Sequence, residues 1–194
     1  MKTALAALLL ATVPLAAAAQ ERTIVKTARV KAPVEEVWKA WTTTEGITTF
    51  FAPSARIEAR PGGLFELHMN PYAKPGMKGA DGMVFLALQE NRMLSFTWNA
   101  PPHLPEARAQ RTSVTVRLAP GTDGFTDVRL THSGWGDGGQ WDKAYDYFNG
   151  AWGRVLANLE KRFVDGPYDW SARLKQMKDY QDAEDAKAAG GKKP

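Results

Sequence analysis

The feature that most constrains the fold is a change of hydrophobic period along the chain. From residue 55 to residue 132, apolar side chains recur at every second position in several short runs separated by turn-forming Gly and Pro residues. This alternation is typical of half-buried strands, and short connections favour antiparallel pairing. From Trp141 to Phe163 the apolar residues recur at intervals of three and four, which predicts one long helix with a broad apolar face. We therefore expect a two-layer α+β domain.

The first part of the domain adds a strand and two short helices. Residues 23–31 alternate polar with apolar, often β-branched, side chains and predict a strand. Pro33 ends this strand and suits the first turn of a helix over residues 34–41, which carry apolar side chains at helical spacing. A second short apolar run covers residues 47–51 and stops at Pro53. The expected order is strand, two short helices, six strands and a long helix, about seven strands in all.

The first nineteen residues have the pattern of a targeting segment. Lys2 precedes a run of leucine and alanine that closes on Ala17-Ala18-Ala19, the pattern of a cleavable secretory signal. A membrane anchor is the alternative, but the run is shorter than the roughly 20 residues that span a bilayer, and Pro14 interrupts it. We expect a mature chain from Gln20 that is secreted or periplasmic and has no stable membrane insertion.

The rest of the chain divides in two. Residues 22–163 hold the periodic patterns and form the expected domain. Residues 164–194 are an extension, for which we expect a weak surface helix over 171–188 and partial disorder.

Composition excludes several classes of site. The chain has 194 residues and no cysteine, so disulfides, thiolate nucleophiles and Cys-ligated zinc are excluded. A formal net charge of +4 without a basic stripe argues against nucleic-acid binding. The three histidines are far apart and lack metal-ligating spacing, and the glycines at 134–139 lack the lysine of a phosphate-binding loop. We expect no metal and no cofactor.

His132 is the polar side chain with the most functional interest. It shares its parity with Val128 and Leu130 and should point toward the long helix, whereas His68 shares its parity with Glu66 and should face solvent. His132 could transfer a proton or orient a ligand. The alternative, which we favour, is a structural histidine that bonds backbone carbonyls and fixes the next loop. Arg154 on the helix flank is interpreted as a solvated charge.

Five short motifs, in order, resemble a known superfamily. The motifs are Ala32-Pro33 with Val37-Trp38, Arg60 to Phe65, Arg92 to Trp98, His132 to Trp135, and Gly150-Ala151-Trp152 with Val155-Leu156 and Leu159-Glu160. Over residues 22–163 the chain is similar to the helix-grip, START-like or SRPBCC superfamily, and more narrowly to homologues of the activator of the heat-shock-protein-90 ATPase. It departs from this pattern at Phe50-Phe51, where tryptophans are usual, and at the inserted Ala151.

The resemblance implies a curved antiparallel sheet that wraps a long C-terminal helix, with a cavity between them. Sequence periodicity alone fits a dry core equally well. The side chains expected to line a cavity are Trp41, Phe65, Leu67, Met69, Leu86, Phe96, Trp98, Val116, Leu130, His132, Phe148 and Trp152.

Three functions fit this layout. We favour non-catalytic binding or carriage of a hydrophobic or aromatic small molecule, because no catalytic constellation is present. A cyclase or hydratase that uses His132 for proton transfer is the first alternative. The second is a protein-interaction module like the chaperone activators, which the expected export disfavours.

Overall fold

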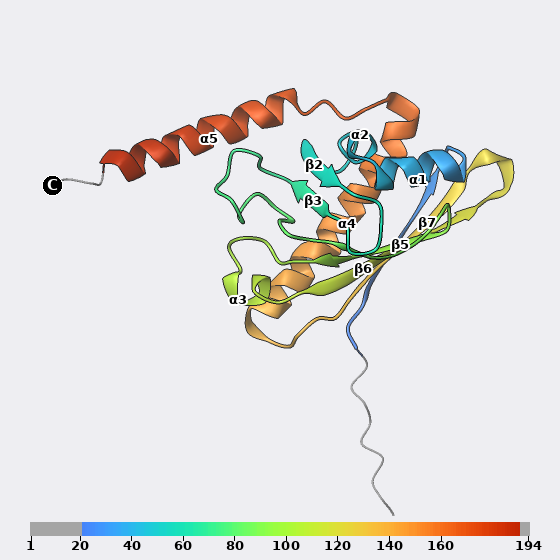
Figure 1. Cartoon of the computed structure of the whole chain (residues 1–194), viewed down its shortest axis with the longest axis horizontal. Coiled ribbons are helices and arrows are strands. Elements are labelled where there is room, and N and C mark those ends of the chain that lie inside the picture. Colours follow the sequence, from blue (N-terminus) through green and yellow to red (C-terminus); the bar gives the residue numbers. More distant parts are fainter. Residues whose placement is uncertain (1–20, 191–194) are drawn as a thin grey trace, which may run out of the picture.

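The structure is a computed structural model that describes residues 21–190, so the expected signal at residues 1–19 lies outside the described residues. Figure 1 shows a strand, two short helices, a sheet and a long helix that crosses the sheet. The elements are β1 (Ile24–Val30), α1 (Val34–Thr42), α2 (Thr44–Ile47), β2 (Ser54–Ile57), β3 (Phe65–His68), β4 (Phe85–Gln89), β5 (Met93–Trp98), α3 (Pro105–Arg108), β6 (Thr112–Pro120), η1 (Thr122–Gly124), β7 (Thr126–Ser133), α4 (Gly139–Asp165) and α5 (Ser171–Gly190).

The seven strands lie in two sheets. Five of them form an antiparallel sheet in the order β1-β7-β6-β5-β4, and β2 pairs with β3 in a two-stranded sheet. The sequence favoured one meander of six consecutive strands, but β3 and β4 are not paired as neighbouring strands; the segments before them are joined by an isolated bridge between Leu64 and Val84. The α+β helix-grip architecture itself is confirmed, with alternate residues such as Val114, Val116 and Leu130 buried.

Strand β4 contains an irregularity that overturns one prediction. The register with β5 shifts between Phe85 and Ala87, so the alternation of faces breaks there. Phe85 takes the inward position, where its ring centroid lies 4.9 Å from that of Phe65, and Leu86 turns outward and is 48% exposed. The prediction that Leu86 lines a cavity is therefore wrong, because parity counted along the strand assumed no bulge.

The long helix α4 completes the hydrophobic core of the domain. Its side chains Phe148, Trp152, Leu156 and Leu159 are buried in one continuous core with the inward residues of the sheet. Near its end, Glu160 accepts a hydrogen bond of 3.0 Å from the backbone N–H of Arg29 on the edge strand β1. This contact pairs a donor that an edge strand would otherwise leave free.

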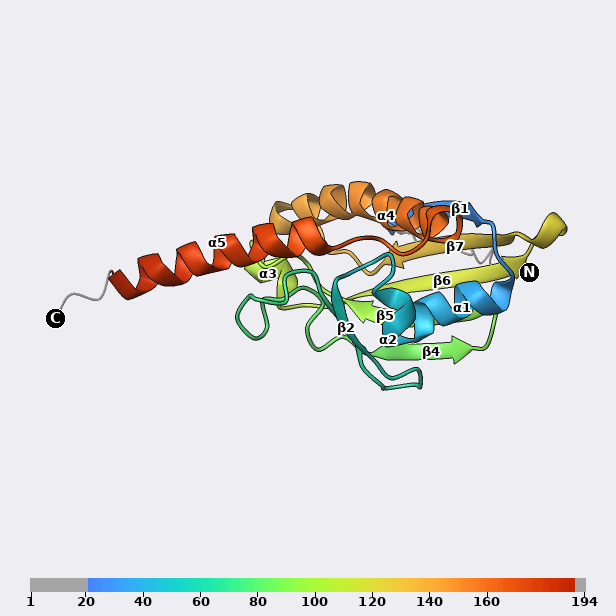
Figure 2. The same cartoon turned by 90° about the horizontal axis from the view of Figure 1, so that it is seen from above.

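The C-terminal extension is fastened to the domain before it leaves it. The Trp170 indole donates to the carbonyl of Thr48 at 2.6 Å, and the Tyr168 N–H donates to the carbonyl of Thr49 at 2.8 Å. Beyond this anchor, α5 runs away from the body of the domain in both views (Figures 1 and 2). The expected surface helix is present; it begins at the predicted residue and extends two residues beyond the predicted end.

No helix within residues 21–190 is both long enough and apolar enough to cross a bilayer.

Candidate functional site

His132 lies on the inner face of the sheet, where β7 meets α4. Its side chain has no exposed surface, as the strand parity predicted. Its Nε2 is 2.7 Å from the hydroxyl of Thr112, and its Nδ1 is 2.9 Å from Nε1 of Trp152. The sequence-based interpretation expected backbone carbonyls as partners. The partners are instead side chains from the neighbouring strand and from α4.

These partners fix the tautomer of His132. An indole N–H only donates, so Nδ1 of His132 must accept from Trp152 and carries no proton. The proton then sits on Nε2 and is donated to Thr112, whose hydroxyl can donate in turn to the Trp98 carbonyl at 3.3 Å. Every polar atom in this series of hydrogen bonds is satisfied, and four elements, α4, β7, β6 and β5, are tied together.

Burial lowers the pKa of His132 from 6.5 to about 3. The cause is loss of hydration, which penalises the charged imidazolium. A neutral ring with both nitrogens engaged has no lone pair or proton to offer a substrate. This geometry argues against the proton-transfer role and for a structural role, in which the carbonyl of His132 also accepts from Trp135 at 3.0 Å.

A cavity lies beside α4 and shares Trp152 and Trp98 with this network. Its volume is about 710 Å³ and it opens to solvent. Its walls are the loop after β3 (residues 69–80), the segment after β5 (98–103), the flank of α4 (147–158) and the start of the C-terminal extension (168–177). The volume is within the range of about 300–1,000 Å³ that is usual for small-molecule sites.

The floor of the cavity is aromatic. Phe51 stacks on Trp98 with ring centroids 5.8 Å apart, and Phe148 stacks on Trp152 at 6.0 Å. These four rings are almost fully buried. The two pairs adjoin each other, because the ring centroids of Trp98 and Trp152 lie 5.3 Å apart. Exposed apolar side chains continue the surface toward the mouth, namely Met77, Tyr147 and Tyr168.

One arginine holds the loop wall of the cavity in place. Arg108 on α3 donates to the carbonyls of Gly76, Gly79 and Ala100 at 2.6–2.8 Å and pairs with Asp81 at 3.2 Å. Burial lowers the pKa of the Arg108 guanidinium and the Asp81 carboxylate opposes this effect. The guanidinium therefore stays charged and acts as a clamp between the two loops.

The residues predicted to line a cavity separate into three groups. Met69, Trp98, Phe148 and Trp152 line the cavity. Trp41, Phe65, Leu67, Phe96, Val116 and Leu130 are buried in the core and, like His132, do not line it. Phe65 shows the reason. Its ring, on β3 of the two-stranded sheet, stacks on Phe96 of β5 in the five-stranded sheet with centroids 3.9 Å apart, so the two sheets interlock there. Leu86 is on the outer surface.

Sequence reasoning missed most of the polar wall. Lys78, Arg154 and Arg173 line the cavity from three different elements, although Arg154 was interpreted as a solvated charge. Phe51 carried a usable signal, since it closes the short apolar run before Pro53. The residues of the extension carried none, because the approach of residues 168–177 to α4 depends on the turn at Gly166, where φ is +94°.

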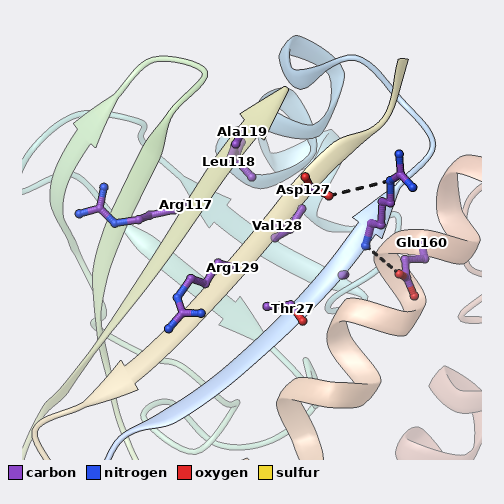
Figure 3. A pocket seen from close by; sticks show the side chains of 10 residues that line it. Thr27, Arg117, Leu118, Ala119, Asp127, Val128, Arg129 and Glu160 are labelled. Carbon is purple, nitrogen blue, oxygen red and sulfur yellow. Dashed lines mark hydrogen bonds and ion pairs between the residues drawn. The ribbon is translucent and has the colours of Figure 1, made fainter. Parts of the chain in front are cut away.

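A second groove lies across β1, β7 and β6 (Figure 3). Charged side chains such as Arg117, Arg129 and Asp127 line it, and the dashed contacts in Figure 3 show Asp127 and Glu160 already engaged. Arg29 provides both partners: its Nε lies 4.0 Å from Asp127, and its backbone N–H donates to Glu160. Within residues 21–190, no group of three or more acidic or histidine side chains could hold a metal ion.

Comparison with known proteins gives a family and a set of similar structures. The model of the family "Activator of Hsp90 ATPase homolog 1-like protein" matches residues 31–163. No relative was found among the curated proteins.

Three solved structures illustrate the likeness. Protein MLL2253 from Mesorhizobium loti is 26% identical with a TM-score of 0.59, covering 74% of this chain and 97% of its own. The Aha1 dimer from Colwellia psychrerythraea is 20% identical with a TM-score of 0.58, covering 75% and 98%. CalU16 from Micromonospora echinospora is 21% identical with a TM-score of 0.55, covering 83% and 84%. The last two support the fold alone.

Proposed function

The chain belongs to the family of activator of Hsp90 ATPase homolog 1-like proteins, and from this premise we propose that it binds or carries a hydrophobic or aromatic small molecule in the cavity beside α4. The observation that carries the proposal is the aromatic floor, which Phe51, Trp98, Phe148 and Trp152 build under an open space of about 710 Å³. Flat rings offer a large apolar contact area to a planar or aliphatic guest.

Binding without catalysis fits the cavity better than an enzyme built on His132. That residue lies outside the cavity lining, is neutral and has both nitrogens engaged. A role as a partner of a chaperone would rest on the family resemblance alone, and no surface feature among the described residues favours it.

Retention of a guest is the first test. Native mass spectrometry of the protein purified from its own host should show a bound small molecule. A library of lipids and aromatic compounds should contain members that raise the melting temperature, because a ligand that binds only the folded state stabilises it. Ligand-free spectra together with no thermal shift across the library would contradict the proposal.

A variant that fills the cavity locates the binding. Ala157 lines the cavity and is exposed on α4, so Ala157→Trp should place an indole in the space and weaken binding about tenfold or more. Asn149→Trp is the matched control, because Asn149 is exposed on the same helix and does not line the cavity. Equal binding by both variants would place the guest elsewhere.

Export remains part of the proposal and rests on the pattern of residues 1–19. The mature protein isolated from its host should begin at Gln20. An intact N-terminus in a cytoplasmic fraction would contradict export and would leave the cavity proposal untouched.

A further inference from the structure

The charged side chains around the cavity are of one sign. Lys78, Arg108, Arg154 and Arg173 line it, and no Asp or Glu among the described residues does. Arg108 is already committed to Asp81 and to three backbone carbonyls. Within residues 21–190, the other three cations make no ion pair. The cavity therefore has an uncompensated positive rim.

The three cations come from separate parts of the chain. Lys78 is in the loop after β3, Arg154 is on α4, and Arg173 is in the first turn of α5. The lysines of α5, in contrast to Arg173, are paired with carboxylates of the same helix; Nζ of Lys175, for example, lies 2.7 Å from the carboxylate of Asp179. Like charges around one cavity without a counter-charge repel one another, and a bound anion reduces this cost.

A tryptophan with an indole N–H unpaired in the described part of the chain contributes to the floor of the same cavity. The side chain of Trp98 lines the cavity and the residue is 4% exposed, yet its indole Nε1 has no hydrogen-bond partner among the described residues. The Nε1 atom is itself buried, and within residues 21–190 Nε1 of Trp41, in the core, is unpaired in the same way, so the unpaired donor does not by itself select a guest. Trp98 offers the guest apolar ring surface, and the cationic rim selects an anionic group.

We propose that the guest is an amphipathic organic acid, whose apolar body lies on Phe51, Trp98 and Trp152 and whose anionic group lies among Lys78, Arg154 and Arg173. This inference rests on the proposed function and narrows its ligand class. Arg173 lies beyond residues 31–163, the part that matches the family model, so this anchor belongs to the extension of this chain.

Two fluorescent probes separate the charge from the apolar body. N-phenyl-1-naphthylamine is neutral, and 8-anilinonaphthalene-1-sulfonate adds one anionic group to the same ring system. We expect both to bind the full-length mature protein and the sulfonate to bind about tenfold more tightly at low salt. Its affinity should fall as NaCl rises, because salt screens exposed charges, while that of the neutral probe should hold.

Charge-removing variants test the residues. Arg154→Gln and Arg173→Gln should each lower the affinity for the sulfonate probe about twofold to fivefold and leave the affinity for the neutral probe unchanged. Lys175→Gln is the matched control, because it removes the same charge from α5 at a position outside the cavity lining. Circular dichroism and melting temperature verify that each variant is folded.

The outcomes are distinguishable. Equal affinity for the two probes, or equal loss in the control, overturns the anion inference and leaves the proposed function standing. Binding of neither probe to the folded protein overturns the proposed function and this inference with it. Selective loss of the sulfonate in the two arginine variants supports both.

Discussion

Trp98 and Trp152 lie side by side, with ring centroids 5.3 Å apart, but their indole N–H groups are in opposite situations. Nε1 of Trp152 donates to His132 inside a fully paired chain, whereas Nε1 of Trp98 has no partner among the described residues. The same residue type therefore ties elements together through its indole N–H at one position and contributes only ring surface at the other. The difference distinguishes the structural side, where the Trp152 N–H meets the buried His132, from the cavity side, where both rings contribute apolar surface.

The two sides also differ in electrostatics. The structural side keeps one titratable group, His132, neutral by burial. On the cavity side, Arg154 and Arg173 are exposed and form no ion pair among residues 21–190. Polar groups that are buried and fully paired specify one packing, whereas unpaired charges at an open space are available to a ligand.

The largest expected effect is on the structural side. His132→Ala should lower the free energy of unfolding by about 3–5 kcal/mol, because it leaves a void and removes the partners of Trp152 and Thr112. Urea denaturation followed by circular dichroism measures this. His68→Ala, on a half-buried surface histidine, should cost less than about 1 kcal/mol. Unchanged stability of His132→Ala with a large loss of ligand affinity would assign His132 to ligand binding and not to the stability of the fold.

The neutral state of His132 predicts a pH dependence. The folded-state pKa of about 3 is below the usual 6.5, so the unfolded chain binds more protons between these values. The free energy of unfolding carries no penalty from His132 well above pH 6.5. It falls by about 1.4 kcal/mol per pH unit as the pH drops toward 3. From pH 6.5 to 5, where most carboxylates stay ionised, the wild type should lose about 2 kcal/mol more than His132→Gln. Parallel curves for the two proteins would show that His132 is not held neutral.

A pair of tryptophan variants tests the comparison directly. Trp152→Phe and Trp98→Phe remove the same atoms, but only the first leaves the Nδ1 of His132 unpaired. We expect Trp152→Phe to cost about 1–2 kcal/mol more stability than Trp98→Phe, as measured by urea denaturation. An equal stability loss would mean that the Trp152–His132 bond contributes little.

The smallest stability effect is expected at the anchor of the extension. Trp170→Ala removes the bond to the carbonyl of Thr48 and should cost less than about 1 kcal/mol, since α5 extends beyond the core. Hydrogen exchange at the start of α5 should accelerate, and sulfonate binding should weaken because Arg173 is no longer held at the rim. Asp179→Asn, further along α5, is the control. Unchanged exchange in Trp170→Ala would show that other contacts hold the extension.

Much of the fold was predictable from local patterns. The alternation in residues 112–118 and 126–132 identified β6 and β7 and placed His132 inward, because a strand's side chains alternate regardless of the rest of the molecule. The bulge in β4 was not predictable, since it depends on how Phe85 fits against Phe65, 20 positions earlier.

The candidate site was predictable only in its aromatic part. Trp98, Phe148 and Trp152 are large, apolar and at regular spacing, so periodicity selected them. Whether such a ring meets another ring or an open space depends on loops and on the extension, whose course is set by contacts such as those of Arg108 and Trp170.

By itself, then, the sequence determined the element order, the inward face of each regular strand, the apolar stripe of α4 and the absence of cysteine chemistry, because these follow from composition and from the periods of helix and strand. Only the tertiary structure decided that the layers interlock around Phe65 and Phe96, that the open space lies beside α4, and that three distant cations share its rim. Those features depend on side chains far apart in the chain meeting in space, and no local period records such a meeting.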